Sequence, residues 1–204
     1  LSWVMDQQEA FKAYLMQKKS VQFTFRGTDF SVEFIGAEIY PQSFAAVASR
    51  LHEFKGVNMI ADIGNGTVNL LRVIDRKPDP TTMVTEACGV KDCAIAMRLA
   101  LANEHAGAKV DDSIIERIIR KGTAEIDSEY LNPLVNAARV YTDGLFRRMR
   151  EDGYDPRTMK LYVMGGGSCL IQNFGDFDPS RVTFNNDIHA NAKGYEALAA
   201  MSHK

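Results

Sequence analysis

The stretch Val-Asn-Met-Ile-Ala-Asp-Ile-Gly-Asn-Gly-Thr-Val-Asn-Leu-Leu-Arg-Val, residues 57–73, decides how the rest of the chain is organised. Two β-prone apolar runs flank a Gly-Asn-Gly turn, so this stretch predicts a β-hairpin whose turn residues accept positive φ angles. The glycines also let backbone N–H groups approach an anion, and Asp62 is placed to hold a hydrated Mg²⁺ beside it. An ordinary hairpin whose Asp hydrogen-bonds its own turn is the alternative, and both interpretations stay open at this point.

Composition narrows the class of protein. The chain has 204 residues, of which 46% are hydrophobic and 25% charged, and its net charge is −2. This is enough for one sizeable core, or for one domain and part of another, and no basic excess favours nucleic acid. No apolar run approaches the length of a membrane span. The 3 cysteines lack C-x-x-C spacing and predict neither a disulfide framework nor a zinc site, but reduced thiols in the cytoplasm.

The beginning of the chain predicts a short helix followed by a hairpin. Good helix formers occupy residues 6–19, and apolar residues then alternate with polar ones over 21–25 and 30–34. No basic residues are interleaved with the aromatic ones, so we expect a core or interface face rather than a base-stacking surface; its members are Phe23, Phe25, Phe30 and Phe34. Because the chain starts at Leu1 without a signal peptide, we expect an internal cut in a longer protein.

A proline separates the next two predicted elements. A strand over residues 37–40 is expected to stop at Pro41, and a helix to run from Ser43, its cap, to about His52. Gln42 then lies at the strand-to-helix junction, where an amide side chain faces either a cleft or only solvent.

The segment after the central hairpin predicts one more strand and three helices. We expect a loop at residues 78–80, a strand over 83–86 and a largely buried helix over 90–103. Two further helices are expected over residues 113–121, between an Asp cap and Gly122, and over 132–152, with Pro133 in the first turn. The cations at the end of the second helix indicate a solvated face, with a helix end near a nucleotide as the alternative; they are Arg117, Arg120 and Lys121.

A second glycine site follows about a hundred residues after the first. Residues 160–164 read as a buried strand, and Gly165, Gly166, Gly167 and Ser168 lead directly into a helix. In this geometry the backbone passes close against a flat or anionic ligand, although a tight turn is the simpler alternative. The segment lacks G-x-G-x-x-G and the P-loop Lys, so it implies neither dinucleotide nor P-loop chemistry. A short strand over 181–184 and a helix over 191–201 complete the expected elements.

Two glycine sites around a mostly helical insert resemble the second half of the actin-like ATPase superfamily, which includes actin, Hsp70 and the sugar kinases. The run 62–67 is similar to its second phosphate loop, 164–168 to its adenosine motif, and 191–195 to its closing helix. Within the superfamily the sequence is most similar to the bacterial plasmid-segregation branch (ParM/StbA-like). There a Pro-acid/amide-Ser-x-x-Ala motif precedes the phosphate loop, as residues 41–46 do here.

The resemblance implies a role for each matching residue. It implies that Asp62 binds Mg²⁺ through water and that Gln42 orients the attacking water, because Gln is too weak a base to deprotonate it. It also implies that backbone and side-chain donors hold the β- and γ-phosphates, from Gly64, Asn65, Gly66 and Thr67. Gly165, Gly166 and Gly167, with Ser168, would lie against the adenosine. The superfamily's first phosphate loop has no match in this chain, so we expect half of a two-sided site and no turnover by this chain alone.

We therefore expect an α/β fold: an RNase H-like actin-type domain with a mixed sheet flanked by helices, preceded by a β-hairpin segment. Residues 1–56 are expected to be the end of a first actin-like domain, and residues 57–204 a second, nucleotide-binding domain. The expected function is Mg-ATP hydrolysis that drives filament assembly for plasmid or DNA segregation, with a DNA-binding adaptor and no direct nucleic-acid or membrane contact. A nucleotide-binding structural subunit without turnover is the alternative, and a sugar-kinase-like phosphotransferase is a weaker one.

Overall fold

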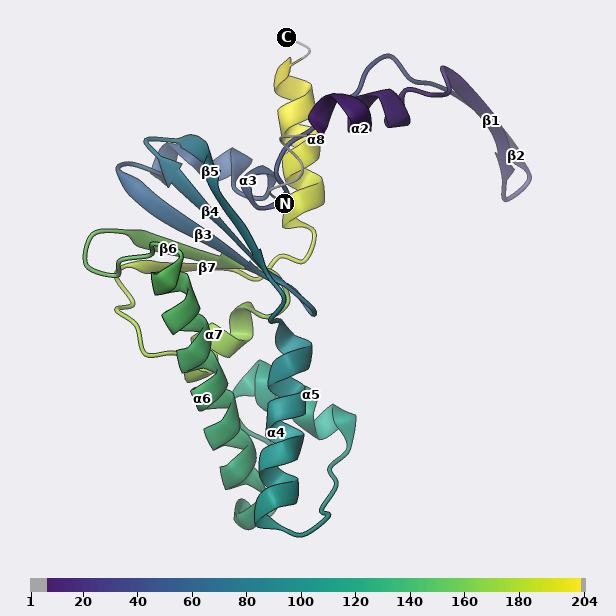
Figure 1. Ribbon diagram of the computed structural model, residues 1–204. Helices are drawn as coiled ribbons and strands as arrows, with labels where there is room; N and C mark the ends of the chain where they lie inside the picture. Colours follow the sequence, from purple (N-terminus) through teal and green to yellow (C-terminus); the bar gives the residue numbers. More distant parts are fainter. Residues whose placement is uncertain (1–6, 203–204) are drawn as a thin grey trace.

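The computed structural model describes residues 7–202, and a five-stranded mixed sheet forms their centre (Figure 1). Its order is β5-β4-β3-β6-β7, from the strands β3 (Val57–Ile63), β4 (Val68–Ile74), β5 (Lys77–Glu86), β6 (Lys160–Met164) and β7 (Val182–Asn185). β3 and β4 pair antiparallel, as do β4 and β5, whereas β6 lies parallel to β3 and β7 parallel to β6. The predicted central hairpin and mixed sheet are confirmed, but none of the turn residues Gly64, Asn65 and Gly66 has a positive φ.

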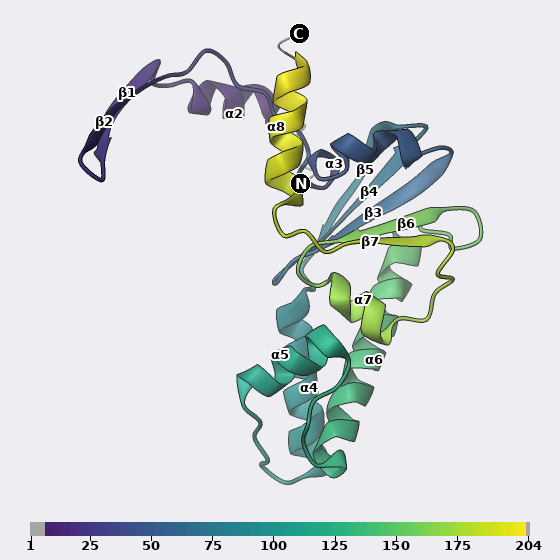
Figure 2. The ribbon, with the colours of Figure 1, turned by 180° about the vertical axis from the view of Figure 1, so that it is seen from behind.

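Helices cover both faces of this sheet (Figures 1 and 2). One side carries α4 (Val90–Glu104), α5 (Asp112–Lys121), α6 (Ser128–Glu151) and α7 (Ser168–Phe174), and the other carries α3 (Gln42–Ala45), the 3₁₀ turn η1 (Ala48–Glu53) and α8 (Ala190–Ser202). Successive side chains of a strand point to opposite faces. Met59, Ala61 and Ile63 accordingly pack in the core with α6 and α7, while Ile60 packs with Phe44 of α3. Asp62 shares the parity of Ile60 and so belongs to the α8 side.

The first elements project away from the sheet as an arm (Figure 1). It consists of α2 (Gln8–Leu15) and the hairpin of β1 (Ser20–Phe25) and β2 (Thr28–Glu33). The helix is shorter than expected, and Asp6 lies outside the described residues. Within the described part of the chain the aromatic face is not in a core, since Phe23 is 47% and Phe25 56% exposed. The prediction of a core position is wrong, and the interface alternative stays a prediction.

The segment before β3 differs from the expectation in two ways. Residues 37–40 form no strand, since no neighbouring strand pairs with them in the described part of the chain. The single helix to His52 is instead the short α3 followed by η1, and Ser43 is not a cap but a buried residue inside α3. Phe44 of α3 and Phe54, the residue directly after η1, pack into the core on this face of the sheet.

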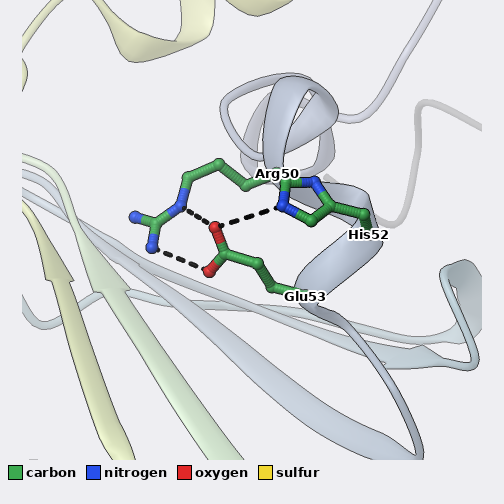
Figure 3. A network of polar contacts seen from close by, with 3 residues as sticks. All are labelled: Arg50, His52 and Glu53. Carbon is green, nitrogen blue, oxygen red and sulfur yellow. Dashed lines mark hydrogen bonds and ion pairs between the residues drawn. The ribbon is translucent and has the colours of Figure 1, made fainter.

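An ion pair stabilises the end of η1 (Figure 3). The Arg50 guanidinium donates two hydrogen bonds of 2.8 Å to the carboxylate of Glu53, and His52 lies 4.0 Å from the same carboxylate. Donation from Arg50 lowers the pKa of Glu53. This bidentate pair favours the 3₁₀ turn because each planar group fixes the orientation of the other.

Three further expectations are corrected in the part of the chain that follows the central hairpin. Residues 78–80 are not a loop but part of β5, which tolerates prolines because it is an edge strand. α4 is buried along one face only, and Leu99 on its other face is 59% exposed. α6 begins at Ser128, capped by Asp127, so Pro133 lies inside the helix rather than in its first turn. Pro133 leaves the Glu129 carbonyl without a helical N–H, and the His105 ring nitrogen contacts that carbonyl at 3.0 Å.

The other helix and strand expectations are confirmed to within a few residues. α5 is capped by Asp111 and ends at Gly122, whose φ of 77° requires glycine. Among residues 7–202, no helix has the length and apolar character needed to cross a bilayer.

Candidate functional site

Asp62 lies near the carboxyl end of the central strand β3, and its side chain belongs to the face of the sheet that carries α8. It is 6% exposed, and the Asn191 amide Nδ2 donates to its Oδ2 at 3.4 Å. Burial raises the pKa of the Asp62 carboxyl, and the hydrogen bond from Asn191 opposes that rise. A nearly buried carboxyl group with one weak donor is poorly stabilised when ionised, and a cation beside it would stabilise that ionised form.

The turn after Asp62 is a tight loop held against the beginning of α4. The Gly64 N–H donates to the Thr67 carbonyl at 2.8 Å, which closes the turn, and Asn65 and Gly66 form its exposed tip. The Val90 N–H donates to Gly64 at 3.1 Å, and the Lys91 N–H to Asn65 at 2.9 Å. The carbonyl groups of Gly64 and Asn65 thus accept hydrogen bonds from the first residues of α4, so they face away from an anion on the exposed side of the turn.

The approach of Gly89 explains why the two elements fit together. A Cβ on Gly89 would lie 2.4 Å from the Asn65 carbonyl oxygen, so only glycine allows this contact. The Tyr141 hydroxyl of α6 donates to the Gly89 carbonyl at 2.8 Å. The turn is therefore fixed by two helices of the α4 side.

The second glycine segment wraps over the end of β3. β3 and β6 are parallel neighbours, with Met164 opposite Asp62. The turns that follow these two strands therefore meet at the carboxyl ends of the strands. Gly165 has φ +82°, and a Cβ there would lie 2.5 Å from Asp62 Oδ1. The Gly167 N–H donates to the Ile63 carbonyl at 2.9 Å. The structure thus brings the two predicted glycine sites into direct contact.

Ser168 points into the protein. Its hydroxyl donates to Asn186 Oδ1 at 2.8 Å, and the residue is 3% exposed. This hydrogen bond joins the start of α7 to the segment that follows β7. In this structure the Ser168 hydroxyl therefore fixes the end of the glycine turn and is not exposed to a ligand.

A pocket of about 340 Å³ opens beside the two turns, between α4, α5 and α7. The exposed residues Asn65 and Gly166 line the pocket on the side of the turns, and apolar side chains such as Ile115 and Ile119 form part of its wall. Its rim carries charged pairs: Arg98 to Asp112 at 2.6 Å and Arg120 to Glu116 at 2.7 Å. An apolar interior with a few polar groups and this volume is typical of a small-molecule site.

Gln42 is the exposed first residue of α3, on the α8 side of the sheet. α8 connects this segment to Asp62. The Tyr195 hydroxyl donates to the Tyr40 carbonyl at 3.4 Å, and the Asp62 charge contributes to the raised pKa of Tyr195, after burial. α8 thus contacts Asp62 through Asn191 and the segment that precedes Gln42 through Tyr195.

Several residues at this site were not identified from the sequence. Asn191 appeared only as part of the closing helix, and Lys91 and Glu116 carry no local motif. Arg120 was assigned to a solvated face, with proximity to a nucleotide as the alternative; it lies at the rim of the pocket. The cations at the end of α5 are the sequence feature that could indicate this pocket, because Arg120 is one of its lining residues.

The mixed sheet, its two helical layers and the paired glycine turns have the arrangement of part of an actin-like fold. Scans against protein-family models and against curated proteins found no match. Solved structures match over most of the chain. A non-polymerisable quadruple mutant of pCBH ParM has a TM-score of 0.67 and 17% identity, covering 97% of this chain and 65% of that one.

Two further structures show the same relationship. The Alp12 filament structure has a TM-score of 0.71 and 16% identity, covering 97% of this chain and 64% of its own. Ta0583, an archaeal actin homolog in complex with ADP, has a TM-score of 0.66 and 18% identity over 90% of this chain and 64% of its own. This chain therefore spans a little under two thirds of their length. At these identities the comparisons establish the actin-like fold.

Proposed function

We propose that this chain contains the nucleotide-binding second domain of an actin-like ATPase that hydrolyses Mg-ATP as it assembles into filaments. The observation that carries the proposal is that Asp62 and both glycine turns meet at the carboxyl ends of β3 and β6, next to a pocket of about 340 Å³. We assign residues 1–56 to the end of a first domain and residues 57–204 to the second. Residues 41–54 pack against the second domain's sheet through α3 and η1.

The matched structures support the nucleotide and the filament separately. The archaeal actin homolog Ta0583 was solved with ADP, a Bacillus thuringiensis ParM with ATP, and Alp12 as a filament. For this chain we propose ATP as the nucleotide and self-association into filaments. A role in plasmid or DNA segregation, with a DNA-binding adaptor and no direct contact to nucleic acid, completes the proposal.

In this proposal the pocket takes the adenosine and the turns take the phosphates. The base lies on the apolar wall near Ile119, and Gly166 allows the ring system to approach the backbone. Glu116 accepts hydrogen bonds from the ribose hydroxyls. The turn from Gly64 to Thr67 donates to the β- and γ-phosphates from its exposed side, where no carbonyl of Gly64 or Asn65 faces the anion.

The residues present fit a divalent cation bound through water. Asp62 is a nearly buried carboxylate, and the buried Asn191 Oδ1 has no hydrogen-bond partner among the described residues. Within residues 7–202, no group of three or more His, Cys, Asp or Glu side chains forms a metal cluster, so water would supply most ligands, as is usual for Mg²⁺. Bound there, Mg²⁺ neutralises phosphate charge during phosphoryl transfer. Gln42, exposed at the start of α3, would orient the attacking water.

Nuclear magnetic resonance titration of the 204-residue chain tests the assignment, because it detects binding even at millimolar affinity. With Mg-ADP we expect amide shifts in the 64–67 turn, at Gly165–167 and at Glu116. No shifts there at about 10 mM nucleotide would refute the site. Phosphate release and sedimentation of the natural gene product then test the rest. Filament assembly without phosphate release would replace the ATPase by a nucleotide-binding structural subunit.

A further inference from the structure

Asn191 brings the only side-chain hydrogen bond that the described residues give to Asp62, across 129 residues of sequence. An ionised carboxylate only accepts hydrogen bonds, so the NH₂ group of the amide must face Asp62. The amide oxygen must then point the other way. In the structure Asn191 Oδ1 is buried and has no hydrogen-bond partner among the described residues.

A buried acceptor without a partner is uncommon in folded proteins and calls for an explanation. Simple stabilisation of the fold does not provide one, since an apolar side chain of the same size would fill the space without leaving an oxygen unpaired. A water or ligand bound beside Asp62 would satisfy it. Of the four buried side-chain atoms without a partner among the described residues, Asn191 Oδ1 is the one whose side chain hydrogen-bonds Asp62, so it points to something bound beside that carboxylate.

The position of Asn191 is set by close packing of α8 against α3. A Cβ on Gly194 would lie 1.8 Å from the Ala45 carbonyl oxygen, so the two backbones touch directly. One turn along α8 from Asn191, the Tyr195 hydroxyl donates to the Tyr40 carbonyl at 3.4 Å. α8 cannot shift without displacing α3, so the packing of these two helices fixes the position of the Asn191 amide beside Asp62.

We propose that Asn191 is a positioning residue of the nucleotide site: its NH₂ group holds the Asp62 carboxylate, and its free oxygen accepts a hydrogen bond from a water bound to the divalent cation. This inference rests on the proposed function, because it assigns the cation to the same site. Partners that orient a metal's ligands typically change metal affinity by 10–100-fold when they are removed. The same range is expected for Asn191.

Manganese binding to the 204-residue chain with ADP provides the test, since Mn²⁺ replaces Mg²⁺ and broadens nearby amide signals. In the wild type we expect broadening at residues 62–64 and at the Asn191 side-chain NH₂. Asn191→Leu keeps the volume but removes both polar atoms, and should weaken Mn²⁺ binding by roughly tenfold or more. Its ADP affinity in EDTA should stay within about twofold of the wild type, because Asn191 faces the cation and not the nucleotide.

Lys193→Ala is the matched control on the same helix. Lys193 is exposed and pairs with Asp187 at 2.6 Å, so its removal should leave Mn²⁺ affinity unchanged. Equal Mn²⁺ affinity in Asn191→Leu and the wild type would overturn the inference while leaving the proposed function intact. A wild type that shows no ADP-dependent broadening would instead overturn the proposed function, and the inference with it.

Asn191→Asp keeps the proposal testable if the Leu variant does not fold. It has the same shape but places a carboxylate beside Asp62, so the pair repels in the absence of a cation. Mn²⁺ should then raise the melting temperature of Asn191→Asp more than that of the wild type. An equal or smaller rise would overturn the inference.

Discussion

Gly165→Ala is the substitution with the most sharply defined consequence, because Gly165 lies where the two glycine turns meet. Its φ of +82° falls in the left-handed region, which costs an L-residue about 1–2 kcal/mol. A Cβ would also lie 2.5 Å from Asp62 Oδ1 and 2.6 Å from the Ile63 carbonyl oxygen. The carboxylate can rotate away, but the backbone oxygen cannot, and overpacking of this kind costs about 1–3 kcal/mol.

The sum predicts that Gly165→Ala lowers the free energy of unfolding by about 2–5 kcal/mol. Urea denaturation followed by circular dichroism measures it, with the slope of the transition expected to stay unchanged. Because the Asp62 carboxylate must move, the variant should also lose the Mg²⁺ dependence of nucleotide binding.

Gly166→Ala is the matched control at the neighbouring position. No atom lies within 4 Å of its added Cβ, and its φ is not in the left-handed region. Its stability should therefore lie within about 1 kcal/mol of the wild type, while nucleotide binding weakens because the methyl group enters the pocket. Equal unfolding midpoints for Gly165→Ala and Gly166→Ala would refute the packing argument for the junction.

Three further outcomes follow from the proposed roles. Gln42→Ala in the natural gene product should lower phosphate release by roughly 10²-fold or more through lost positioning; an equal loss of nucleotide affinity would assign Gln42 to binding. Burial raises the pKa of Asp62, so keeping the carboxylate ionised in the folded state lowers stability at pH values above that pKa. Asp62→Asn should therefore melt at an equal or higher temperature at pH 7 while abolishing the Mg²⁺ dependence of binding. That thermal advantage should shrink as the pH falls through the raised native pKa, where the wild-type carboxyl gains its proton; a lower melting temperature at pH 7 contradicts the reasoning. Glu116→Ala should weaken ADP binding about tenfold, by the loss of a charge-assisted hydrogen bond, whereas Arg117→Ala, on the same helix but outside the pocket, should not; equal effects would remove the ribose assignment.

Local sequence was sufficient where one short-range preference decides the structure. Glycines at 64 and 66 between two β-prone runs indicate a tight hairpin. An Asp at 111 or 112 and Gly122 indicate both ends of α5, and in the structure Asp111 is the cap. The same kind of reasoning was wrong at residues 37–40 and 78–80. Whether an extended segment becomes a strand depends on a hydrogen-bonding neighbour, and whether a proline is tolerated depends on lying at the sheet edge.

Sequence by itself determined the α/β class, the central hairpin and both glycine turns, because turn chemistry and period-2 alternation act between adjacent residues. The tertiary structure alone decided what those turns face. It placed Asn191 against Asp62 and gathered α4, α5 and α7 around one pocket. It also set the His105 ring against the carbonyl that Pro133 leaves free. These contacts join residues far apart in the chain, and close packing of whole elements decides them, so no local pattern specifies which side chains meet.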